Sequence, residues 1–586
     1  EAFVDAVQAE EGPMREFAPA AEAEVGMRIE NAPAHRIFRP GDEVQAQWSA
    51  FVAEGAGGVE AGWKVVDYDE ETVAEGKIEA GEGQSTGEIR FEAADTGVFR
   101  LIATAKTGGM RRAYEAEDVF GVVRTPDTSE APVSRSRFGT HIVHQRSDDG
   151  SYSAKFVDIA RMMGIRWNRM HDCGGETTQW PFVEKNKGEY RLVADEAEFF
   201  RGQGFELLGL LEKTPGWASP DGRMTSTPRD IAEWEAYVEK TVTFFKPYIH
   251  AWEIWNEPFT SSFWTSPWSE YTPLLASAHR IIKRIDPEAT VVGVCAGHSV
   301  LYGGNGRFMK EVFDAGASGH FDVFSFHCPM PGYSTDTPMM PNEYAAMPWE
   351  KALADFRAFL EQYGEVKPMM NSEAAMFSRG FWRRHPQVTD NASAHYFPPA
   401  DYREAVAYNV RSHVVSFAGG VERFFYYNMD QDGTGIDDIY RGAMIAPDGM
   451  PKPFAFTYPV MIDLLDGREF VKKVALGRRT SAYVFEGRGK TVAVVWTLYA
   501  RDGERGRLSM TAPSEGRAVS VMGKTLSEFR QGEEAGVEIG RQPCYLVFSS
   551  ETSPVLAALG GAKAEEPARY VKQPEKPPAL DKLPGY

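Results

Sequence analysis

The sequence predicts a multidomain protein with a central (β/α)8 TIM barrel between two β-sandwich domains. First, the chain has 586 residues, too many for a single hydrophobic core. Second, both ends contain short segments of alternating polar and apolar residues, which is typical of antiparallel sheets with one exposed face. Third, near-continuous apolar strand segments alternate with helical segments between these ends, as in a parallel barrel covered by helices.

The N-terminal sandwich is predicted to cover residues 1–125. Its strand segments are separated by glycine-rich turns, and the clearest are Val44–Trp48, Trp63–Tyr68, Gly87–Phe91 and Val98–Ala103. Residues 126–137 are polar and contain two prolines, so they predict a linker.

The barrel is predicted to cover residues 138–466. Eight strands are expected, at Phe138–Ile142, Ile165–His171, Phe205–Leu211, Ala251–Trp255, Thr290–Cys295, Val323–His327, Pro368–Glu373 and Arg423–Asn428. Helices are expected between them, at Ile231–Phe245, Tyr271–Ile285, Trp349–Tyr363 and Tyr402–Phe417. Eight strand–helix units over this length fit one barrel with insertions.

A second sandwich is predicted for residues 467–550. Its strand segments are Ser481–Phe485, Thr491–Thr497 and Pro543–Phe548. Residues 551–586 are rich in Pro, Lys, Glu and Ala, a composition that predicts an extended tail.

The composition excludes several classes of partner. The net charge is −21, from 63 basic and 84 acidic residues, which argues against nucleic acid and anionic membranes. No apolar run reaches the ~18 residues that span a bilayer, so no membrane insertion is expected. Four widely spaced cysteines (Cys173, Cys295, Cys328 and Cys544) indicate neither a zinc knuckle nor a disulfide scaffold. We expect an exported protein whose signal lies outside this chain, and the sequence does not indicate an oligomeric state.

Ionisable, amide and aromatic side chains recur where the predicted strands end. In a barrel of this kind the active site is built at the C-terminal ends of the strands. The residues at these ends are His141, Arg169, His171, Asn256, Glu257, His327, Glu373, Tyr426 and Tyr427. A purely structural barrel would not need such a rim, so the pattern favours an active site.

Glu257 and Glu373 are the candidate catalytic pair, at the ends of the fourth and seventh strands. Two facing carboxyl groups can cleave an acetal, because one attacks the anomeric carbon while the other donates a proton to the leaving oxygen. We expect Glu373 to be the ionised nucleophile and Glu257 the acid/base with a raised pKa. The alternative for each is a buried ion pair.

The motif around Glu257 resembles that of the clan A glycoside hydrolases. The stretch Trp252-Glu-Ile-Trp-Asn-Glu-Pro258, followed by Phe263-Trp264, is most similar to family 39, which contains β-xylosidases and α-L-iduronidases. The segments Ser325–His327 and Gly449–Phe454 fit the same pattern. The resemblance covers about Phe138 to Leu465. It implies a retaining glycoside hydrolase that acts on a carbohydrate, and separately we expect no cofactor.

The resemblance also implies roles for the rim residues. Asn256 would hydrogen-bond a sugar 2-hydroxyl, and His327 would hold the nucleophile or bind a hydroxyl. Arg169 and His171 are the candidates for orienting Glu373. The candidate aromatic platforms for sugar rings are Trp217, Trp264, Tyr426 and Tyr427.

Three positions depart from the family pattern. The nucleophile strand reads Asn-Ser-Glu373-Ala-Ala, tyrosines replace the usual tryptophan on the eighth strand, and Cys-Pro follows His327. Because these positions touch the sugar, the substrate of family 39 cannot be carried over. An exo-acting β-xylosidase-like enzyme on neutral glycans stays one alternative.

A basic segment follows the nucleophile strand and favours an anionic substrate, uronate-bearing or sulfated. The segment reads Ser-Arg-Gly-Phe-Trp-Arg-Arg-His, and its candidate binding residues are Arg379, Trp382 and Arg383, to which the loop after the first strand adds His141, His144 and Arg146. Arginine forks bind carboxylate or sulfate in a bidentate manner. Alternatively, Arg383 and Arg384 pair with acids such as Asp390 and Glu404.

Two other classes of function stay open. The chain could be a non-catalytic carbohydrate-binding protein, although such a barrel would not need both carboxylates. A metal-dependent hydrolase could use His141, His144, His171 and Asp172, but no strong ligand motif such as His-Glu-x-x-His occurs. We therefore expect no catalytic metal.

Overall fold

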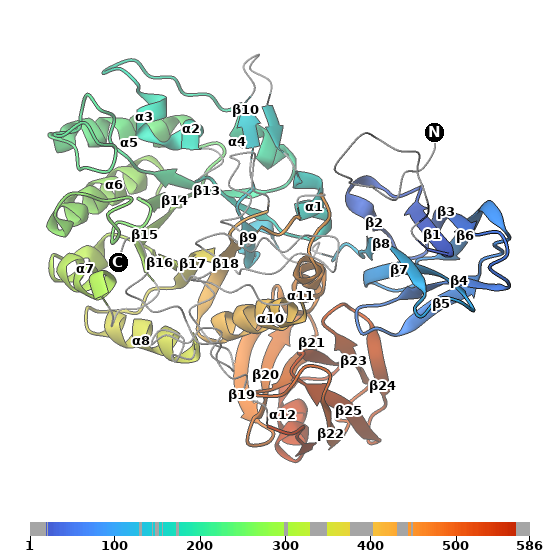
Figure 1. Ribbon diagram of the computed structural model, residues 1–586. Coiled ribbons are helices and arrows are strands. Elements are labelled where there is room, and N and C mark those ends of the chain that lie inside the picture. Colours follow the sequence, from blue (N-terminus) through green and yellow to red (C-terminus); the bar gives the residue numbers. More distant parts are fainter. Residues whose placement is uncertain are drawn as a thin grey trace, which may run out of the picture.

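The computed structural model describes residues 19, 21–127, 132–142, 144–146, 152–154, 156–171, 175–297, 303–327, 349–374, 402–429, 443–446 and 449–569. Three domains follow one another along the chain: a β-sandwich, a closed eight-stranded barrel and a second β-sandwich (Figure 1). The predicted fold class is confirmed. Among the described helices, none has the length and apolar character needed to cross a bilayer.

The N-terminal sandwich packs a three-stranded sheet on a five-stranded sheet. The first sheet has the order β1 (Ala23–Ile29), β3 (Glu43–Val52), β6 (Gly83–Glu92). The second has the order β2 (Ile37–Phe38), β8 (Tyr114–Val122), β7 (Gly97–Thr107), β4 (Val59–Val66), β5 (Thr72–Lys77). Alternate residues of these strands, such as Val44 and Ala46, are buried between the sheets, which is why the sequence alternates.

The barrel is a closed parallel sheet of eight strands. In order around the barrel they are β9 (Phe138–Thr140), β12 (Trp167–Arg169), β13 (Glu206–Leu211), β14 (Ala251–Ile254), β15 (Thr290–Ala296), β16 (Val323–His327), β17 (Met369–Ala374) and β18 (Val421–Tyr426). Each of the eight predicted strand segments overlaps one of them. A two-stranded hairpin, β10 (His144–Arg146) and β11 (Tyr152–Ala154), follows the first strand.

Helices cover the outside of the barrel (Figure 1). They are α1 (Val157–Met162), α2 (Gly175–Thr178), α3 (Trp180–Val183), α4 (Asp195–Gly202), α5 (Ile231–Phe245), α6 (Tyr271–Ile285), α7 (Gly303–Asp314), α8 (Trp349–Glu361), α10 (Tyr402–Ala418) and α11 (Thr457–Leu465). Short 3₁₀ turns complete the described connections: η1 (Ala34–Arg36), η2 (Val133–Arg135), η3 (Trp268–Glu270), η4 (Ala317–Gly319) and η8 (Pro453–Phe456). The bounds predicted for α5 and α6 agree with those observed. At the start of α5, the side chain of Asp230 accepts a hydrogen bond from the backbone N–H of Ala232, as a helix cap should.

The C-terminal sandwich contains a six-stranded and a three-stranded sheet. The larger has the order β19 (Glu469–Ala475), β20 (Thr480–Gly487), β21 (Lys490–Thr497), β26 (Cys544–Phe548), β23 (Gly516–Ser520), β24 (Thr525–Phe529). The smaller has the order β25 (Glu534–Gly540), β22 (Arg505–Thr511), β27 (Lys563–Glu565).

The prediction of an extended tail from residue 551 is wrong for the part that the structure describes. Residues Thr552–Gly560 form helix α12, and Lys563–Glu565 form β27, which pairs with β22. Val555 and Leu559 of the helix are buried in the core of the C-terminal sandwich. These apolar residues at helical spacing outweigh the polar composition around them.

Arg403 joins all three domains. It extends from α10 of the barrel and donates to the backbone oxygen of Tyr68 (2.6 Å) and to Asp69 (3.2 Å) of the N-terminal sandwich. It also pairs with Asp502 of the C-terminal sandwich. Lys524 of the C-terminal sandwich bonds Asp67 at 2.9 Å, so the two sandwiches also contact each other directly.

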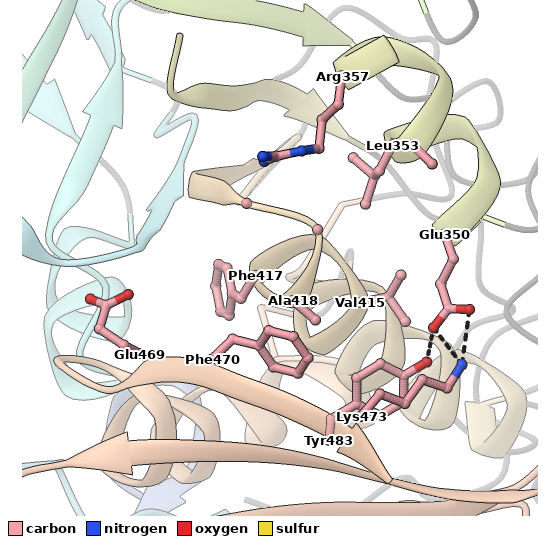
Figure 2. Close-up of a pocket in the computed structure, with 13 residues that line it drawn as sticks. Glu350, Leu353, Arg357, Val415, Phe417, Ala418, Glu469, Phe470, Lys473 and Tyr483 are labelled. Atoms are coloured by element: carbon pink, nitrogen blue, oxygen red, sulfur yellow. Dashed lines mark hydrogen bonds and ion pairs between the residues drawn. The ribbon is translucent and has the colours of Figure 1, made fainter. Parts of the chain in front are cut away.

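A cavity of about 580 Å³ is lined by α8 and α10 of the barrel and by β19 and β20 of the C-terminal sandwich (Figure 2). Lys473 bonds Glu350 across it at 2.7 and 2.9 Å, and Tyr483 donates to the same carboxylate. Gly419 and Gly420, which precede β18, line the cavity. The cavity therefore lies near the N-terminal ends of the strands, away from the predicted catalytic pair.

Candidate active site

The interior of the barrel is apolar at one end and charged at the other. The apolar plug consists of Trp167, Leu208, Ala251, Val292, Val323, Met370 and Phe425. Side chains two residues further along a strand point the same way. In five of these strands the residues at that position are Arg169, Glu253, Ser325, Ser372 and Tyr427. The polar layer thus begins directly above the plug, towards the C-terminal ends of the strands.

Arg169 is the centre of this layer. Its three nitrogens contact three acceptors: Nε lies 2.7 Å from Glu253 Oε2, Nη2 lies 2.7 Å from Asn256 Oδ1, and Nη1 lies 3.0 Å from Glu373 Oε2. The side chains of Arg169 and Glu253 are fully buried. Burial acts to lower the pKa of Arg169, but Glu253 and the other negative groups around it raise it, so the guanidinium stays charged.

Glu253 is a buried carboxylate beneath the catalytic pair. Ser372 donates to its Oε1 at 2.7 Å, while Arg169 occupies Oε2. Burial acts to raise the pKa of Glu253, but the charge of Arg169 lowers it below the ordinary value. Glu253 is therefore ionised and takes up much of the positive charge of Arg169.

The two candidate catalytic carboxyl groups lie on either side of His327. The imidazole Nδ1 is 2.9 Å from Glu257 Oε1 and 3.8 Å from Glu373 Oε2. One oxygen of Glu257 and one of Glu373 lie within 4.8 Å of each other and of His327. The two side chains are 24% and 23% exposed, so both reach solvent at the barrel mouth. Of the two carboxyl groups, His327 hydrogen-bonds Glu257, and the expected role of holding the nucleophile or binding a sugar hydroxyl stays a prediction.

The pKa values of the pair are shifted in opposite directions. Burial acts to raise the pKa of Glu257, but the hydrogen bond with His327 lowers it below the ordinary value. Burial raises the pKa of Glu373, and the negative charge of Glu257 adds to this effect. These directions are the reverse of the expected ones. The physical reason is that Glu373 shares Arg169 with Glu253, whereas Glu257 lies within hydrogen-bond distance of His327 Nδ1 (2.9 Å) and Glu373 lies 3.8 Å from the same nitrogen.

A second buried carboxylate, Glu212, supports the loop that carries Asn256 and Glu257. Its Oε2 accepts from the backbone N–H of Asn256 at 3.2 Å, and its Oε1 accepts from Gln179 at 2.6 Å. His171 Nε2 and Lys213 Nζ each lie 3.8 Å from Oε1. His171 is thus placed against Glu212 as well as within 4.8 Å of Glu373.

Left-handed backbone conformations cluster at this rim. Trp255 (φ 67°), Glu257 (φ 41°) and Cys295 (φ 52°) are all non-glycine residues with positive φ. Such conformations cost free energy and are concentrated at functional sites. The chain therefore turns sharply where it presents Glu257.

Two of the predicted aromatic platforms are wrong. Trp264 is 3% exposed and packs edge-on against Trp255, with ring centroids 4.8 Å apart. Tyr426 is fully buried and packs against Phe454 outside the barrel, because its neighbour Tyr427 takes the inward direction. Neither ring can lie against a sugar.

The other predicted binding residues lie at or near the mouth where the structure describes them. Tyr427 is half-buried, with its ring 4.9 Å from that of His141, and His141 Nε2 lies 3.1 Å from the backbone oxygen of Ser372. Trp217 is half-buried and donates through Nε1 to the backbone oxygen of Glu184. Asn256 Oδ1 is committed to Arg169, so its amide N–H groups are the donors left for a sugar hydroxyl. Arg379, Trp382 and Arg383 lie outside the described residues.

Sequence reasoning assigned no role to Glu253, Glu212 or Cys295, although Glu212 stands among the ionisable groups at the strand ends. Glu253 had a signal, since a charged residue inside an otherwise apolar strand needs a buried partner. Cys295, near the end of β15, had a weaker signal. Its spacing from the other cysteines indicates only that it forms no metal or disulfide motif.

Within the described part of the chain, three groups of His, Cys and Glu side chains are close enough to resemble cation ligands. They are His141, His171 and Glu373; Glu253, Cys295 and His327; and Glu257, His327 and Glu373, with the ligand-type atoms of each group within 4.8 Å. Arg169 already occupies an oxygen of Glu253 and of Glu373, and His327 occupies one of Glu257. The contacts favour acid–base chemistry at these side chains.

Comparison with known proteins identifies the fold. No family model and no curated protein matches the sequence. The structure is similar to that of a family 39 glycoside hydrolase from the gut symbiont Bacteroides cellulosilyticus WH2, with 20% identity, a TM-score of 0.60, and coverage of 89% of this chain and 100% of that one. A glucosidase from Croceicoccus marinus matches with 14% identity, a TM-score of 0.47, and coverage of 70% and 95%. The resemblance to family 39 is thus confirmed at the level of the fold.

Proposed function

We propose that the protein is a retaining glycoside hydrolase, with Glu257 as the acid/base and Glu373 as the nucleophile. The observation that carries the proposal is the approach of the two carboxyl groups, since one oxygen of Glu257 lies within 4.8 Å of one oxygen of Glu373. Retaining enzymes have carboxyl groups about 5–5.5 Å apart, whereas inverting enzymes need about 6.5–9.5 Å to admit a water molecule. The fold shared with a family 39 enzyme supports the same assignment.

In the first step Glu373 attacks the anomeric carbon and the bond to the leaving oxygen breaks. Arg169 holds Oε2 of Glu373, which leaves Oε1 as the attacking oxygen. His327 holds Oε1 of Glu257, which leaves Oε2 to carry the proton that the leaving oxygen receives. The product of this step is a glycosyl ester of Glu373.

The two carboxyl groups are close enough to titrate as a coupled pair, so ionisation of one disfavours ionisation of the other. In the free protein, burial and the negative charge of Glu257 raise the pKa of Glu373. Positive charge develops at the anomeric carbon beside Glu373 in the transition state. That charge favours ionised Glu373 and therefore a protonated Glu257. In the second step ionised Glu257 takes a proton from water, and the water oxygen displaces Glu373.

The stereochemistry of the product tests this mechanism. We expect ¹H NMR of the first product formed to show the anomer of the substrate. We also expect the substitution Glu257→Ala to lower turnover about 10²–10⁴-fold. Azide should restore turnover of activated aryl glycosides by this variant and give a glycosyl azide of retained configuration.

The surface carboxylate Glu469, which is paired with Arg137 on another part of the chain, provides a control. Glu469→Ala should leave turnover unchanged. An inverted first product would refute the retaining mechanism. Binding of glycans without any turnover would instead favour the carbohydrate-binding alternative.

We further propose that the substrate carries carboxylate or sulfate groups. The proposal rests on the basic sequence Arg-Gly-Phe-Trp-Arg-Arg at residues 379–384 after β17. Lys213, 24% exposed near the end of β13, adds a cation among the described residues. Glu404, the alternative partner for these arginines, is ion-paired with Arg541 at 2.8 Å.

Single substitutions Arg379→Ala and Arg383→Ala test the charge of the substrate. We expect each to raise KM for charged glycans about tenfold, as loss of a charge-assisted hydrogen bond predicts, and to leave neutral aryl glycosides unaffected. Arg530→Ala, an exposed arginine of the C-terminal sandwich, is the control. Turnover restricted to neutral glycans would refute an anionic substrate without affecting the catalytic assignment.

A further inference from the structure

The buried thiol of Cys295 contacts both sides of the acid/base. Cys295 lies near the end of β15 and is fully buried. Its Sγ is 3.3 Å from the backbone nitrogen of Glu257 and 3.2 Å from Nε2 of His327. Its own backbone N–H donates to Ser325 Oγ at 3.1 Å. One side chain thus links the peptide that carries the acid/base to the imidazole that bonds its carboxyl group.

We propose that Cys295 is a positioning residue that fixes the tautomer of His327 and, through it, the oxygen of Glu257 that carries the proton. The inference deepens the proposed function, since it assumes that Glu257 is the acid/base. It concerns a residue that touches neither substrate nor reacting atoms.

The donors and acceptors around His327 are compatible with one tautomer of its imidazole. His327 Nδ1 faces two carboxylate oxygens, one of Glu257 at 2.9 Å and one of Glu373 at 3.8 Å, so it must carry a hydrogen. A neutral imidazole has a single N–H, which makes Nε2 an acceptor. The group against Nε2 is the thiol of Cys295, which donates its hydrogen there and accepts the N–H of Glu257 on its sulfur.

The surroundings keep the thiol protonated. Burial raises the pKa of Cys295 well above its ordinary value, and the nearby charge of Glu253 acts in the same direction. A thiolate here would face Glu253, an ionised carboxylate, across the cluster that both share with His327. The S–H is therefore available as a donor over the ordinary pH range.

The consequence is an asymmetric carboxyl group. His327 Nδ1–H holds Oε1 of Glu257, so the proton for catalysis is confined to Oε2. Cys295 also supports the left-handed backbone conformation at Glu257, because its sulfur accepts the backbone N–H of Glu257. The charged and titratable groups around Glu257 are His327, Cys295, Glu373, Arg169, His171 and Glu253.

Substitutions of Cys295 separate positioning from packing. In Cys295→Ala the donor to Nε2 is lost, and the Nδ1–H tautomer is no longer enforced. We expect kcat/KM for aryl glycosides with poor leaving groups to fall about five- to tenfold, as loss of one hydrogen bond predicts. Activated leaving groups, which need no proton, should be nearly unaffected. The alkaline limb of the pH profile should move to higher pH, because ionised Glu257 loses a stabilising hydrogen bond.

Three further variants make the comparison interpretable. Cys295→Ser keeps a donor and an acceptor and should restore both the leaving-group dependence and the pH profile. Cys295→Val fills the volume without a donor and should behave like Cys295→Ala. Cys544→Ala removes the other buried free cysteine that the structure describes, in the C-terminal sandwich, and should change neither. An equal loss with every leaving group, or no rescue by serine, would reduce Cys295 to a packing residue.

A second measurement does not depend on activity. In protein labelled with ¹⁵N-histidine, the resonances of His327, assigned with His327→Gln, should show a neutral ring protonated at Nδ1 near pH 7. In Cys295→Ala this pattern should change. A ring protonated at Nε2, or an imidazolium, would refute the inference. A wild-type protein that cleaves no glycoside but shows the Nδ1 tautomer would refute the proposed function. It would still support the hydrogen bonds inferred between Cys295, His327 and Glu257.

Discussion

Replacing Glu373 with alanine is expected to lower turnover on the order of 10⁴-fold or more, because water cannot substitute for a covalent nucleophile. The fold should survive the change. Glu373 is 23% exposed, and Arg169 keeps its bonds to Glu253 and Asn256 when Glu373 is removed. The measurement is the initial rate on an activated aryl glycoside, together with circular dichroism at matched concentration.

Azide provides the specific readout for this residue. In Glu373→Gly the space left by the side chain admits azide on the nucleophile's face, and we expect a glycosyl azide of inverted configuration. The corresponding azide product of Glu257→Ala is expected to be retained, so the two variants distinguish the two roles. Turnover by Glu373→Ala within about tenfold of the wild type, or a retained azide product from Glu373→Gly, would exclude Glu373 as the nucleophile.

The fold was predictable because burial imposes a visible pattern on each element. The run Val-Val-Gly-Val in β15 is apolar throughout, since a parallel barrel strand is covered on both faces. Val44 to Trp48 of β3 alternate instead, since one face of a sandwich sheet is exposed. The prediction of an extended tail was wrong at α12, because the short apolar segment that forms this helix is followed by a longer polar sequence.

The site was predictable only in part, because side-chain direction depends on register. Glu257 and Glu373 stand at strand ends, where any direction leads towards the mouth. Tyr426 and Tyr427 differ by one position, and only the three-dimensional structure distinguishes the outward ring from the inward one. The pairing of charges within the site could not be predicted from the sequence either. Nothing in the sequence indicates that Arg169 divides its charge between Glu253 and Glu373.

Because Arg169 pairs with both Glu253 and Glu373, its substitution is expected to change the stability of the protein as well as its activity. Arg169→Met is expected to lower the free energy of unfolding by about 3–5 kcal/mol at pH 7, because it leaves Glu253 as an unpaired charge in the barrel interior. The loss should shrink as the pH falls. Without Arg169 the pKa of Glu253 in the folded protein rises, so protonation at acid pH relieves the penalty. Denaturant unfolding of the full chain, followed by tryptophan fluorescence, measures the barrel transition against the wild type.

The double substitution Arg169→Met/Glu253→Leu gives the decisive comparison. Replacing a buried ion pair by apolar residues of similar volume is often neutral or stabilising, so the double variant should recover most of the lost stability. It should also lose part of the acid sensitivity of the wild type. In the wild type the lowered pKa of Glu253 contributes stability that is present above its unfolded pKa and lost as the pH falls through the folded value. Activity should stay low in the double variant, because Glu373 and Asn256 still lack their common partner. A stable and fully active double variant would show that the ion pair serves neither stability nor catalysis. A double variant less stable than Arg169→Met would show that the unpaired charge of Glu253 is not the cause of the lost stability.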